Sequence, residues 1–441
     1  MEFSRHNIVA PLIDSDQYYM VNLLSQNADI IDKTQYHQLM EGAYPDTDEL
    51  TRKGYLVDPE EEKKLFRKKY LEFLDNRDTD EVQIFFVPNY SCNFACSYCY
   101  QDQYDVKSDL PGKDIIGAFF RYIDNRFSQR KKYITLFGGE PVLNSKQQKE
   151  FLEHFIQETI KRNLDLAIVT NGYHLLSYLP LLKTASIREI QVTLDGIARK
   201  HNSRRPLKNG KGTFERIVEG IHACLREGLP INLRMVIDKE NLNELPKLAR
   251  FSSAVGWTGN PIFKTQIGRN YELHHCQSNS NRLYTRLELY QDIYKLLKKY
   301  PEIREFHQPA FSMSKFLFKE GRLPDPLFDS CPGTKTEWAF DFTGKIYSCT
   351  ATVGKAGEEL GTFYPEITLD EDKISDWESR DVLSIKECRD CNQQLACGGG
   401  CASIAKNNTN RICAPDCRPV KELISLGITY YFETEKSDLS S

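Results

Sequence analysis

Three cysteines in one short segment are the residues of this sequence best suited to chemistry. Cys92, Cys96 and Cys99 follow a Cys-x3-Cys-x2-Cys spacing, and no fourth cysteine follows nearby. Soft thiolates of this kind bind zinc or iron–sulfur clusters. A structural zinc ion would need a fourth ligand to close its site. Three thiolates on a four-iron cluster would leave one iron open to a substrate. The spacing therefore favours a reactive iron–sulfur site, with buried cysteines or a zinc loop as alternatives.

A second and larger group of cysteines lies toward the end of the chain and comprises Cys331, Cys349, Cys388, Cys391, Cys397, Cys401, Cys413 and Cys417. The chain has 13 cysteines, an odd number without an export signal, which favours metal-binding thiolates over a disulfide framework. Eight cysteines suffice for two sites of four ligands. Zinc remains an alternative here, because Cys-x2-Cys and Cys-x3-Cys spacings also suit a tetrahedral ion.

Two further cysteines stand apart from these groups. Cys224 falls on the apolar face of a predicted helix, which indicates core packing. Cys276 follows His274 and His275, so these residues form either a metal-ligand set or a solvated loop.

The elements that must position these residues alternate in type between residues 81 and 268. Short apolar runs that suit buried strands are Val82 to Pro88, Tyr133 to Gly139, Leu166 to Gly172, Ile190 to Gly196, Ile231 to Ile237 and Pro261 to Ile267. Amphipathic patterns lie between them, such as Phe214 to Leu229. Repeated strand–helix units predict an α/β fold with a parallel sheet, either doubly wound or curled toward a barrel. In such folds the chemistry lies at the carboxyl ends of the strands.

The rest of the chain divides into four regions. The pattern of residues 1–80 predicts a small winged or hairpin-plus-helix module. Its strand pieces are Tyr18 to Leu24, Asp29 to Asp32 and Tyr55 to Val57, and its helices are Lys33 to Glu41 and Glu60 to Leu74. Residues 269–330 form a bridge with one helix, Tyr284 to Lys299. Residues 331–417 are rich in cysteine and turns, as in a region folded around metal. Residues 418–441 are a C-terminal tail.

The composition excludes several classes of protein. The 441 residues carry 58 Lys and Arg against 62 Asp and Glu, a net charge of −4, and 40% are hydrophobic. This balance supports a folded core and about two or three domains. It gives no basic excess for nucleic acid or for an anionic membrane. No signal peptide is visible, and no run approaches the roughly 18 apolar residues of a membrane span. We therefore expect a soluble, cytoplasmic protein.

Motifs at successive strand ends give the chain a family resemblance. The segment Cys92 to Cys99, with an aromatic residue before its last cysteine, is similar to the defining motif of radical S-adenosylmethionine (SAM) enzymes. Gly138 to Pro141, Thr170 to Gly172 and Thr193 to Gly196 follow in the order expected of that family. The resemblance implies a partial (β/α)6 barrel of the TIM type. It also implies a SAM site composed of Tyr98, Gly138, Gly139, Glu140, Pro141, Asn171, Thr193, Asp195 and Arg205, in which the Gly-Gly-Glu-Pro segment holds the methionine amino group.

One arginine in the segment His201 to Pro206 would meet the methionine carboxylate of SAM, by the same resemblance. Arg205 is the residue predicted for this role, and Arg234 on the next strand is the competing candidate.

The second cysteine group resembles the C-terminal extension called the SPASM domain, which carries auxiliary four-iron clusters. The resemblance implies that Cys388, Cys391 and Cys397 share one cluster with Cys413 or Cys417. It implies that Cys331, Cys349 and Cys401 contribute to the other. With the cluster on Cys92, Cys96 and Cys99, the chain would hold three [4Fe-4S] clusters.

The resemblance also implies a reaction. The first cluster, reduced by an external flavodoxin or ferredoxin, would split SAM into methionine and a 5′-deoxyadenosyl radical that abstracts a substrate hydrogen. Relatives with this extension mostly act on peptides, which predicts a maturase of ribosomally made peptides acting on a precursor peptide. An anaerobic sulfatase-maturating enzyme is the alternative, although Thr350 follows Cys349 where those enzymes carry an aspartate. A non-catalytic iron–sulfur scaffold is the alternative from another class.

Residues 1–80 provide a further expectation about the peptide. If this module binds a leader, the strand pieces at Tyr18 to Leu24 or Tyr55 to Val57 would present an unpaired edge to it. A cap over the barrel is the other interpretation of the module.

Overall fold

The computed structural model describes residues 1–101, 110–270 and 281–439. Its centre is a ten-stranded sheet. In spatial order the strands are β11 (Phe263–Arg269), β10 (Ile231–Ile237), β9 (Ile187–Thr193), β8 (Leu166–Thr170), β7 (Lys132–Leu136), β6 (Val82–Val87), β12 (Glu337–Asp341), β13 (Lys345–Tyr347), β14 (Gly361–Thr362) and β15 (Thr368–Leu369). Strands β6 to β11 are parallel, which confirms the predicted α/β fold with a parallel sheet.

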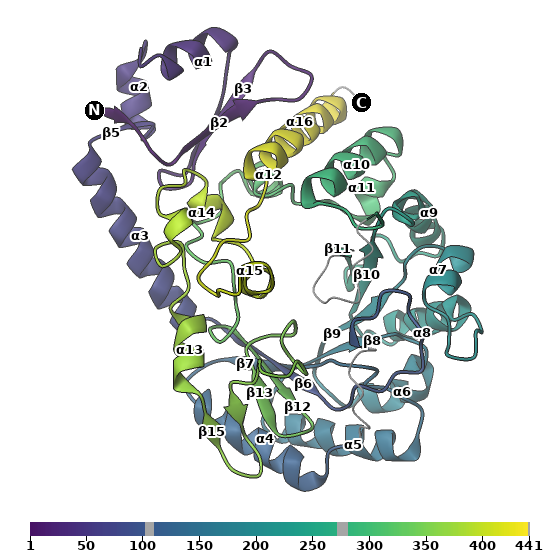
Figure 1. Cartoon of the computed structure of the whole chain (residues 1–441). Coiled ribbons are helices and arrows are strands. Elements are labelled where there is room, and N and C mark those ends of the chain that lie inside the picture. The colour runs from purple at the N-terminus through teal and green to yellow at the C-terminus, as the bar shows by residue number, and fades with distance from the viewer. Residues whose placement is uncertain (102–109, 271–280, 440–441) are drawn as a thin grey trace.

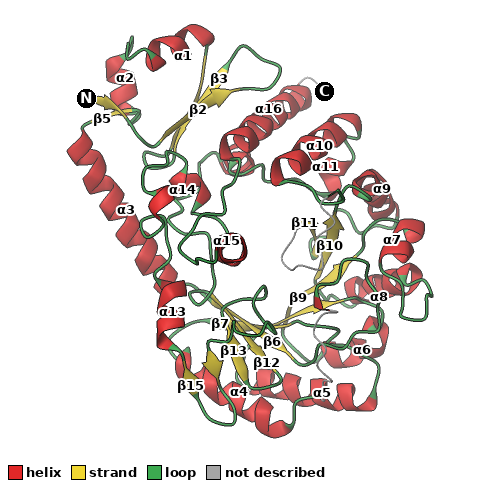
Figure 2. Ribbon diagram, in the orientation of Figure 1, coloured by secondary structure: helices red, strands yellow, loops and turns green. Residues whose placement is uncertain are grey.

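Helices cover the outer side of the parallel strands (Figures 1 and 2). They are α4 (Lys113–Arg126), α5 (Lys146–Lys161), α6 (Leu175–Leu182), α7 (Ala198–Arg204), α8 (Phe214–Arg226) and α9 (Leu245–Ala254), with a short 3-10 turn at Leu242–Glu244. Helix α8 buries Phe214, Ile217, Ile221 and Cys224, so Cys224 is a core residue as predicted. Strands β7, β8 and β9 end a few residues before their predicted bounds, because the glycine segments that follow them form turns rather than strand.

The cysteine-rich region extends the same sheet. Strand β12 pairs in parallel with β6, and β13, β14 and β15 follow in antiparallel order. Trp338 and Phe340 of β12 are buried in the main hydrophobic core. This differs from the expected region folded around metal alone, because two aromatic residues anchor it to the barrel. Its helices are α13 (Glu371–Glu378), α14 (Gln394–Cys397) and α15 (Ala402–Thr409), with a 3-10 turn at Lys386–Cys388.

The N-terminal module contains a three-stranded antiparallel sheet of β2 (Asn7–Pro11), β3 (Tyr18–Asn22) and β4 (Asn27–Ile31). Strand β1 (Glu2–Phe3) pairs with β5 (Leu56–Val57), and helices α1 (Lys33–Met40), α2 (Thr47–Arg52) and α3 (Pro59–Thr79) complete the module. Strand β3 is central and pairs on both sides. The prediction that this strand presents an unpaired edge is therefore wrong.

The module docks on the end of the chain. Tyr19 donates a hydrogen bond of 2.9 Å from its hydroxyl to the Lys421 carbonyl of α16 (Val420–Leu439), and Figure 1 shows α16 beside β2 and β3. A second hydrophobic core combines Ile8, Leu12, Tyr19 and Val21 with Val382, Ile385, Val420 and Ile424. The module thus covers the cysteine-rich region and α16 rather than the barrel.

The bridging segment supplies three helices, α10 (Arg286–Lys299), α11 (Ile303–Phe306) and α12 (Ser314–Glu320). Helices α10 and α12 both contact α16. No helix in the described part of the chain is both long enough and apolar enough to cross a bilayer.

Candidate active site

The carboxyl ends of the parallel strands surround a cavity of about 220 Å³. The loop after β6 contributes three thiols to its wall, those of Cys92, Cys96 and Cys99. The structure also brings the following predicted SAM-site residues to the cavity wall: Tyr98, Gly138, Gly139, Asn171, Thr193 and Arg205. Most of the residues that the motifs single out therefore meet at one place, although they come from separate strand ends.

Two glycines let the segment after β7 lie directly against the cysteine loop. The Gly139 N–H donates to the Asn89 carbonyl at 3.1 Å. A Cβ atom at Gly139 would lie 2.5 Å from the Tyr90 carbonyl oxygen. One at Gly138, whose φ is +130°, would lie 2.7 Å from the Val87 side chain. Only glycine fits here, because any side chain would push the two segments apart.

Glu140 ties two strand ends together rather than facing the cavity. Its carboxylate accepts hydrogen bonds from the Val142 N–H at 2.9 Å, the Thr170 hydroxyl at 2.7 Å and the Asn171 N–H at 2.6 Å. Burial raises the pKa of Glu140 to about 7, although these hydrogen bonds oppose the shift. In this structure Glu140 fixes the end of β8, and its predicted contact with SAM remains a prediction.

Two other predicted residues lie outside the cavity wall. The Pro141 carbonyl accepts a 2.6 Å hydrogen bond from the Gln148 side chain. The Asp195 carboxylate accepts the Val236 N–H at 3.0 Å and the Arg204 Nε at 3.2 Å. Both residues therefore connect the elements around the cavity without lining it.

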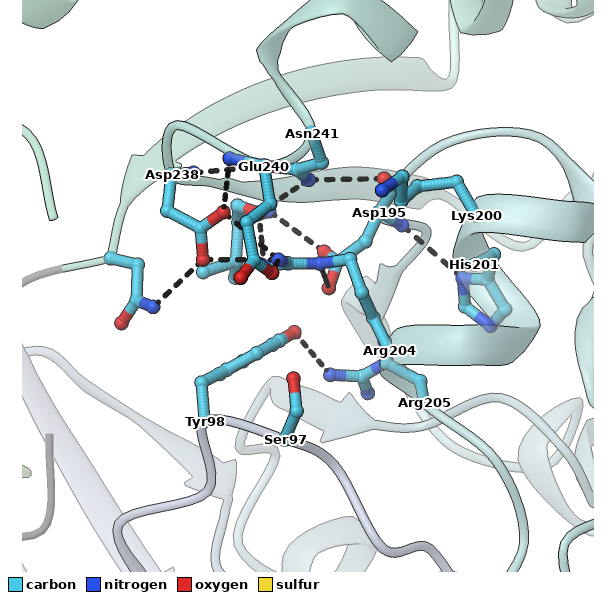
Figure 3. Close-up of polar contacts among 12 residues, drawn as sticks. Ser97, Tyr98, Asp195, Lys200, His201, Arg204, Arg205, Asp238, Glu240 and Asn241 are labelled. Atoms are coloured by element: carbon cyan, nitrogen blue, oxygen red, sulfur yellow. Dashed lines mark hydrogen bonds and ion pairs between the residues drawn. The ribbon is translucent and has the colours of Figure 1, made fainter. Parts of the chain in front are cut away.

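A buried charge network holds the cysteine loop in place (Figure 3). The Arg204 guanidinium, 3% exposed, contacts both Asp195 and Asp238, at 3.2 and 2.9 Å. Arg282 pairs with Asp238 at 2.7 Å and donates to the Ser97 hydroxyl at 2.9 Å. The loop between Cys96 and Cys99 is thus connected through Arg282 to the ends of β9 and β10.

Sequence reasoning missed this network. Asp238 directly follows β10, and a polar residue at the end of a parallel strand is a signal that could have singled it out. Arg204 lies in the segment His201 to Pro206, where the family resemblance predicts a role for Arg205.

Both candidates for the methionine carboxylate line the cavity. Arg205 donates from Nη1 to the Tyr98 hydroxyl at 2.7 Å, and Arg234 donates from Nη1 to Gln191 at 3.4 Å. The Nε atoms of both arginines are buried without a hydrogen-bond partner. Such orphaned donors fit a site that binds an anionic group. The contacts of Arg205 and Arg234 therefore leave both available to a carboxylate.

The second cysteine group separates into two sets. Burial, followed by the neighbouring thiols of Cys397, Cys391 and Cys417, raises the pKa of Cys388 to about 12. Burial likewise raises the pKa of Cys417, with Cys397 and Cys391 again as contributors. Four cysteines are therefore close neighbours, and Cys417 rather than Cys413 joins the set that the spacing left incomplete.

The other set holds three cysteines. Burial raises the pKa of Cys349, and the charges of Glu337, Cys331 and Cys401 act in the same direction. Cys413 lies instead in a separate cavity of about 520 Å³. Cys276, His274 and His275 lie outside the described residues.

The three sets of cysteine thiols are chemically suited to bind iron–sulfur clusters. Within the described ranges, no three His, Cys, Asp or Glu residues converge closely enough to hold a single metal ion. Burial raises the pKa of the Cys92 thiol to about 12, so iron bound there must displace a proton.

Comparison with known proteins agrees with this geometry. Residues 86–252 match the model of the radical SAM superfamily. The chain contains a radical SAM domain. The matched residues include the cysteine loop, the Gly-Gly-Glu-Pro segment and the ends of β8, β9 and β10. This match confirms the family resemblance predicted from the sequence.

The curated relatives of this domain match only part of their own length. The chain is 29% identical over 149 residues to the GTP 3′,8-cyclase of Aliarcobacter butzleri, which covers 33% of this chain and 43% of that protein. It is 30% identical over 172 residues to the GTP 3′,8-cyclase of Campylobacter fetus, which covers 37% and 50%. The chain therefore spans about half the length of the curated relatives it matches.

Solved structures share the fold over more of the chain. Native anSMEcpe with bound AdoMet and Cp18Cys peptide superposes with a TM-score of 0.59 at 16% identity, covering 82% of this chain and 98% of that one. Streptococcus suis SuiB bound to precursor peptide SuiA gives 0.53 at 13% identity, covering 94% and 98%. At these identities the likeness concerns the radical SAM fold with its cysteine-rich C-terminal region.

The predicted peptide-maturase function is wrong, because the comparison of this sequence with curated proteins contradicts it. Several curated relatives of the domain are named GTP 3′,8-cyclase, whereas the peptide-bound structures are similar in fold alone. The same finding overturns the sulfatase-maturating alternative. Neither peptide modification is carried forward below.

Proposed function

We propose that this chain is a SAM-cleaving oxidoreductase whose reaction takes place in the cavity at the carboxyl ends of β6 to β11. The observation that supports the proposal is the convergence of three thiols, the paired glycines and two polar side chains, Asn171 and Thr193, on one cavity wall. Relatives of the radical SAM domain share this part of the sequence.

The residues of the chain would have distinct roles. A four-iron cluster on Cys92, Cys96 and Cys99 would supply the electron that cleaves bound SAM. Gly138 and Gly139 leave room for the methionine end of SAM, and Arg205 or Arg234 would pair with its carboxylate. An external one-electron donor of the flavodoxin or ferredoxin type would reduce the cluster.

The cavity walls also favour an anionic substrate. A second cavity of about 450 Å³ lies between β11, α10 and the cysteine-rich region, and Arg269 lines both cavities. Arg286 and Arg418 line the second one, and neither cavity has an Asp or Glu among its described lining residues. Arg418 lies beside Cys397, Asp416 and Cys401, so Asp416 balances part of its charge and part would serve a bound cluster.

Unpartnered donors strengthen this inference. The Nε atoms of Arg234 and Arg418 are buried without a hydrogen-bond partner, and the side chain of Arg286 makes no hydrogen bond or ion pair within the described chain. Buried guanidinium groups are costly unless an acceptor pairs with them. We therefore propose a substrate that carries a phosphate or carboxylate group, in keeping with the nucleotide named for the curated relatives.

SAM cleavage is tested directly. The reconstituted, anaerobically reduced protein should convert SAM to 5′-deoxyadenosine, and a variant with Cys92, Cys96 and Cys99 all replaced by Ala should not. A matched control is Cys224→Ala, which removes a core thiol far from the cavity and should retain the activity. A wild-type protein that binds iron but forms no 5′-deoxyadenosine would refute the proposal.

The substrate class has its own experiment. GTP and inorganic pyrophosphate serve as phosphate probes and citrate as a carboxylate probe, with binding followed by calorimetry. We expect the binding of at least one probe to weaken about tenfold or more in Arg286→Gln, since a charge-assisted contact contributes about 1.5 kcal/mol or more. The exposed Arg322→Gln variant should not change it. Absence of binding by every probe would contradict the anionic substrate.

A further inference from the structure

The cysteine set near β12 has one thiol fewer than a four-iron cluster normally uses. Cys331, Cys349 and Cys401 are neighbours, whereas Cys413 lies in a different cavity with Trp377. Protein-bound four-iron clusters are usually held by four thiolates. The question is which group of this chain occupies the fourth position.

Glu337 is held between two of the three cysteines. Its Oε1 atom accepts the N–H of Thr350, next to Cys349, at 3.0 Å. Its own N–H donates at 2.9 Å to the carbonyl of Pro332, next to Cys331. The hydrogen bond to Thr350 thus holds the Glu337 carboxylate beside Cys349, and the tight turn holds the Glu337 backbone close to Cys331.

The third cysteine closes the arrangement. The Cys331 thiol accepts the backbone N–H of Ala402, the residue after Cys401. Glu337 is the foremost charged neighbour of the Cys349 thiol, ahead of Cys331 and Cys401. The carboxylate and the three thiols are therefore neighbours, although within the described residues they do not lie close enough together to hold a single metal ion.

The Glu337 side chain is half-buried, and its carboxylate has no cation among the described residues to balance it. None of the ion pairs in the described chain involves Glu337, and burial raises its pKa. Asp329 is a buried acid of the same region, and its negative charge is balanced because it pairs with both Lys335 and Arg380. A buried carboxylate without a counter-charge is destabilising unless something positive binds it.

We propose that Glu337 is the fourth protein ligand of the auxiliary iron–sulfur cluster held by Cys331, Cys349 and Cys401. This inference rests on the proposed presence of iron–sulfur clusters in the chain. It does not depend on SAM cleavage, which concerns a different set of cysteines.

A carboxylate ligand would give this cluster a distinct signature. Oxygen is a harder donor than sulfur, and exchanging thiolates for another ligand type on an iron–sulfur cluster changes its electronic properties and potential. Glu337→Gln keeps the size of the side chain and an oxygen that can accept the Thr350 N–H, so it removes the anionic ligand while preserving the local hydrogen bond. Glu337→Cys restores an anionic ligand, now a thiolate.

The experiment uses the full chain with Cys92, Cys96 and Cys99 replaced by Ala, so that only auxiliary clusters contribute to the spectra. Electron paramagnetic resonance of the reduced protein is recorded with and without cyanide, which binds an iron that lacks a protein ligand. We expect Glu337→Gln to change one auxiliary signal and make it respond to cyanide. Glu337→Cys should give a signal that does not respond. Glu359→Gln is the matched control, because Glu359 is a carboxylate of the same region that pairs with Lys345 at 2.8 Å.

The outcomes separate the two proposals. An unchanged spectrum and cyanide response in Glu337→Gln would overturn the ligand assignment, and so would a parent protein whose auxiliary signal already responds to cyanide. Failure to bind any auxiliary cluster would overturn it as well. If the wild-type chain did not cleave SAM but kept auxiliary signals that depend on Glu337, only the proposed function would be refuted.

Discussion

Replacing Gly139 by Ala tests whether the close approach of two backbone segments makes the cavity functional. A Cβ atom at this position would lie 2.5 Å from the Tyr90 carbonyl oxygen, whereas ordinary contacts begin at 3.4 Å. The atoms in the way belong to the backbone of the cysteine loop, which cannot swing aside as a flexible side chain does. The loop or the segment after β7 would therefore have to withdraw by about 1 Å.

A displacement of that size should be costly at a reacting centre. A misplacement of about 1 Å can lower a rate about 100-fold, which corresponds to about 2.7 kcal/mol in the activation free energy. The assay is the initial rate of 5′-deoxyadenosine formation, normalised to the iron content of each preparation. Thermal unfolding of the same samples would show whether the fold persists.

The control is Gly117→Ala, the same chemical change in the middle of α4. A Cβ atom there would meet only the end of the Arg121 side chain, at 3.2 Å. This variant should keep its rate and gain up to about 1 kcal/mol of stability from the better helix former. If Gly139→Ala retained the rate of the wild-type protein, the reasoning about the close approach would be refuted.

Three further predictions concern clusters, charges and pH. Cys417→Ser should lower the iron and sulfide content by about one cluster, and Cys413→Ser should leave it unchanged, as measured in anaerobic preparations. Arg204→Gln should lower the free energy of unfolding in urea by about 3–5 kcal/mol, because the buried Asp195 loses its cationic partner and Asp238 keeps only Arg282. Stability should also decrease as the pH falls from 6.5 to about 4, since burial lowers the pKa of His6 and His307 to about 4 and the unfolded chain then binds more protons. Replacing both histidines by Asn should flatten that part of the pH profile in denaturant titrations.

Each of these predictions has a control and an outcome that would contradict it. Equal loss of iron in the two cysteine variants would remove the distinction between Cys413 and Cys417. Lys183→Gln breaks an exposed ion pair with Glu227 and should cost no more than about 1 kcal/mol, so a similar loss in Arg204→Gln would argue against a buried network. An unchanged pH profile in the double histidine variant would exclude these two side chains as its cause.

The parallel half of the fold was predictable because its signals are local. Strand β10 has the predicted bounds, and α8 begins at the predicted Phe214, since an apolar run or an amphipathic stripe is written in consecutive residues. The pairing of β12 with β6 was not predictable. More than 200 residues separate these strands, and their apolar composition does not specify which edge of the sheet they join.

The candidate site shows the same division. Its motifs were visible because each lies at the end of one predicted strand, where parallel folds gather functional groups. The orientation of Glu140 toward the β8 backbone and the choice of Cys417 over Cys413 depend on three-dimensional proximity, which spacing along the chain cannot give. The Arg204–Asp238 pair joins α7 to the end of β10, and neither residue carries a motif.

The hydrogen bonds that join the first residues of the chain to the last have a consequence for how the protein is made. Besides the bond from Tyr19 to Lys421, the Ile13 N–H donates to Thr429 at 3.2 Å and Ser425 donates to the Pro11 carbonyl at 2.5 Å. The N-terminal module packs against α16, and the ribosome synthesises α16 only after nearly all of the rest of the chain. Until then, Ile8, Leu12 and Tyr19 would remain exposed on the nascent protein. Chaperone binding during translation should therefore concentrate on the earliest residues and end when α16 leaves the exit tunnel.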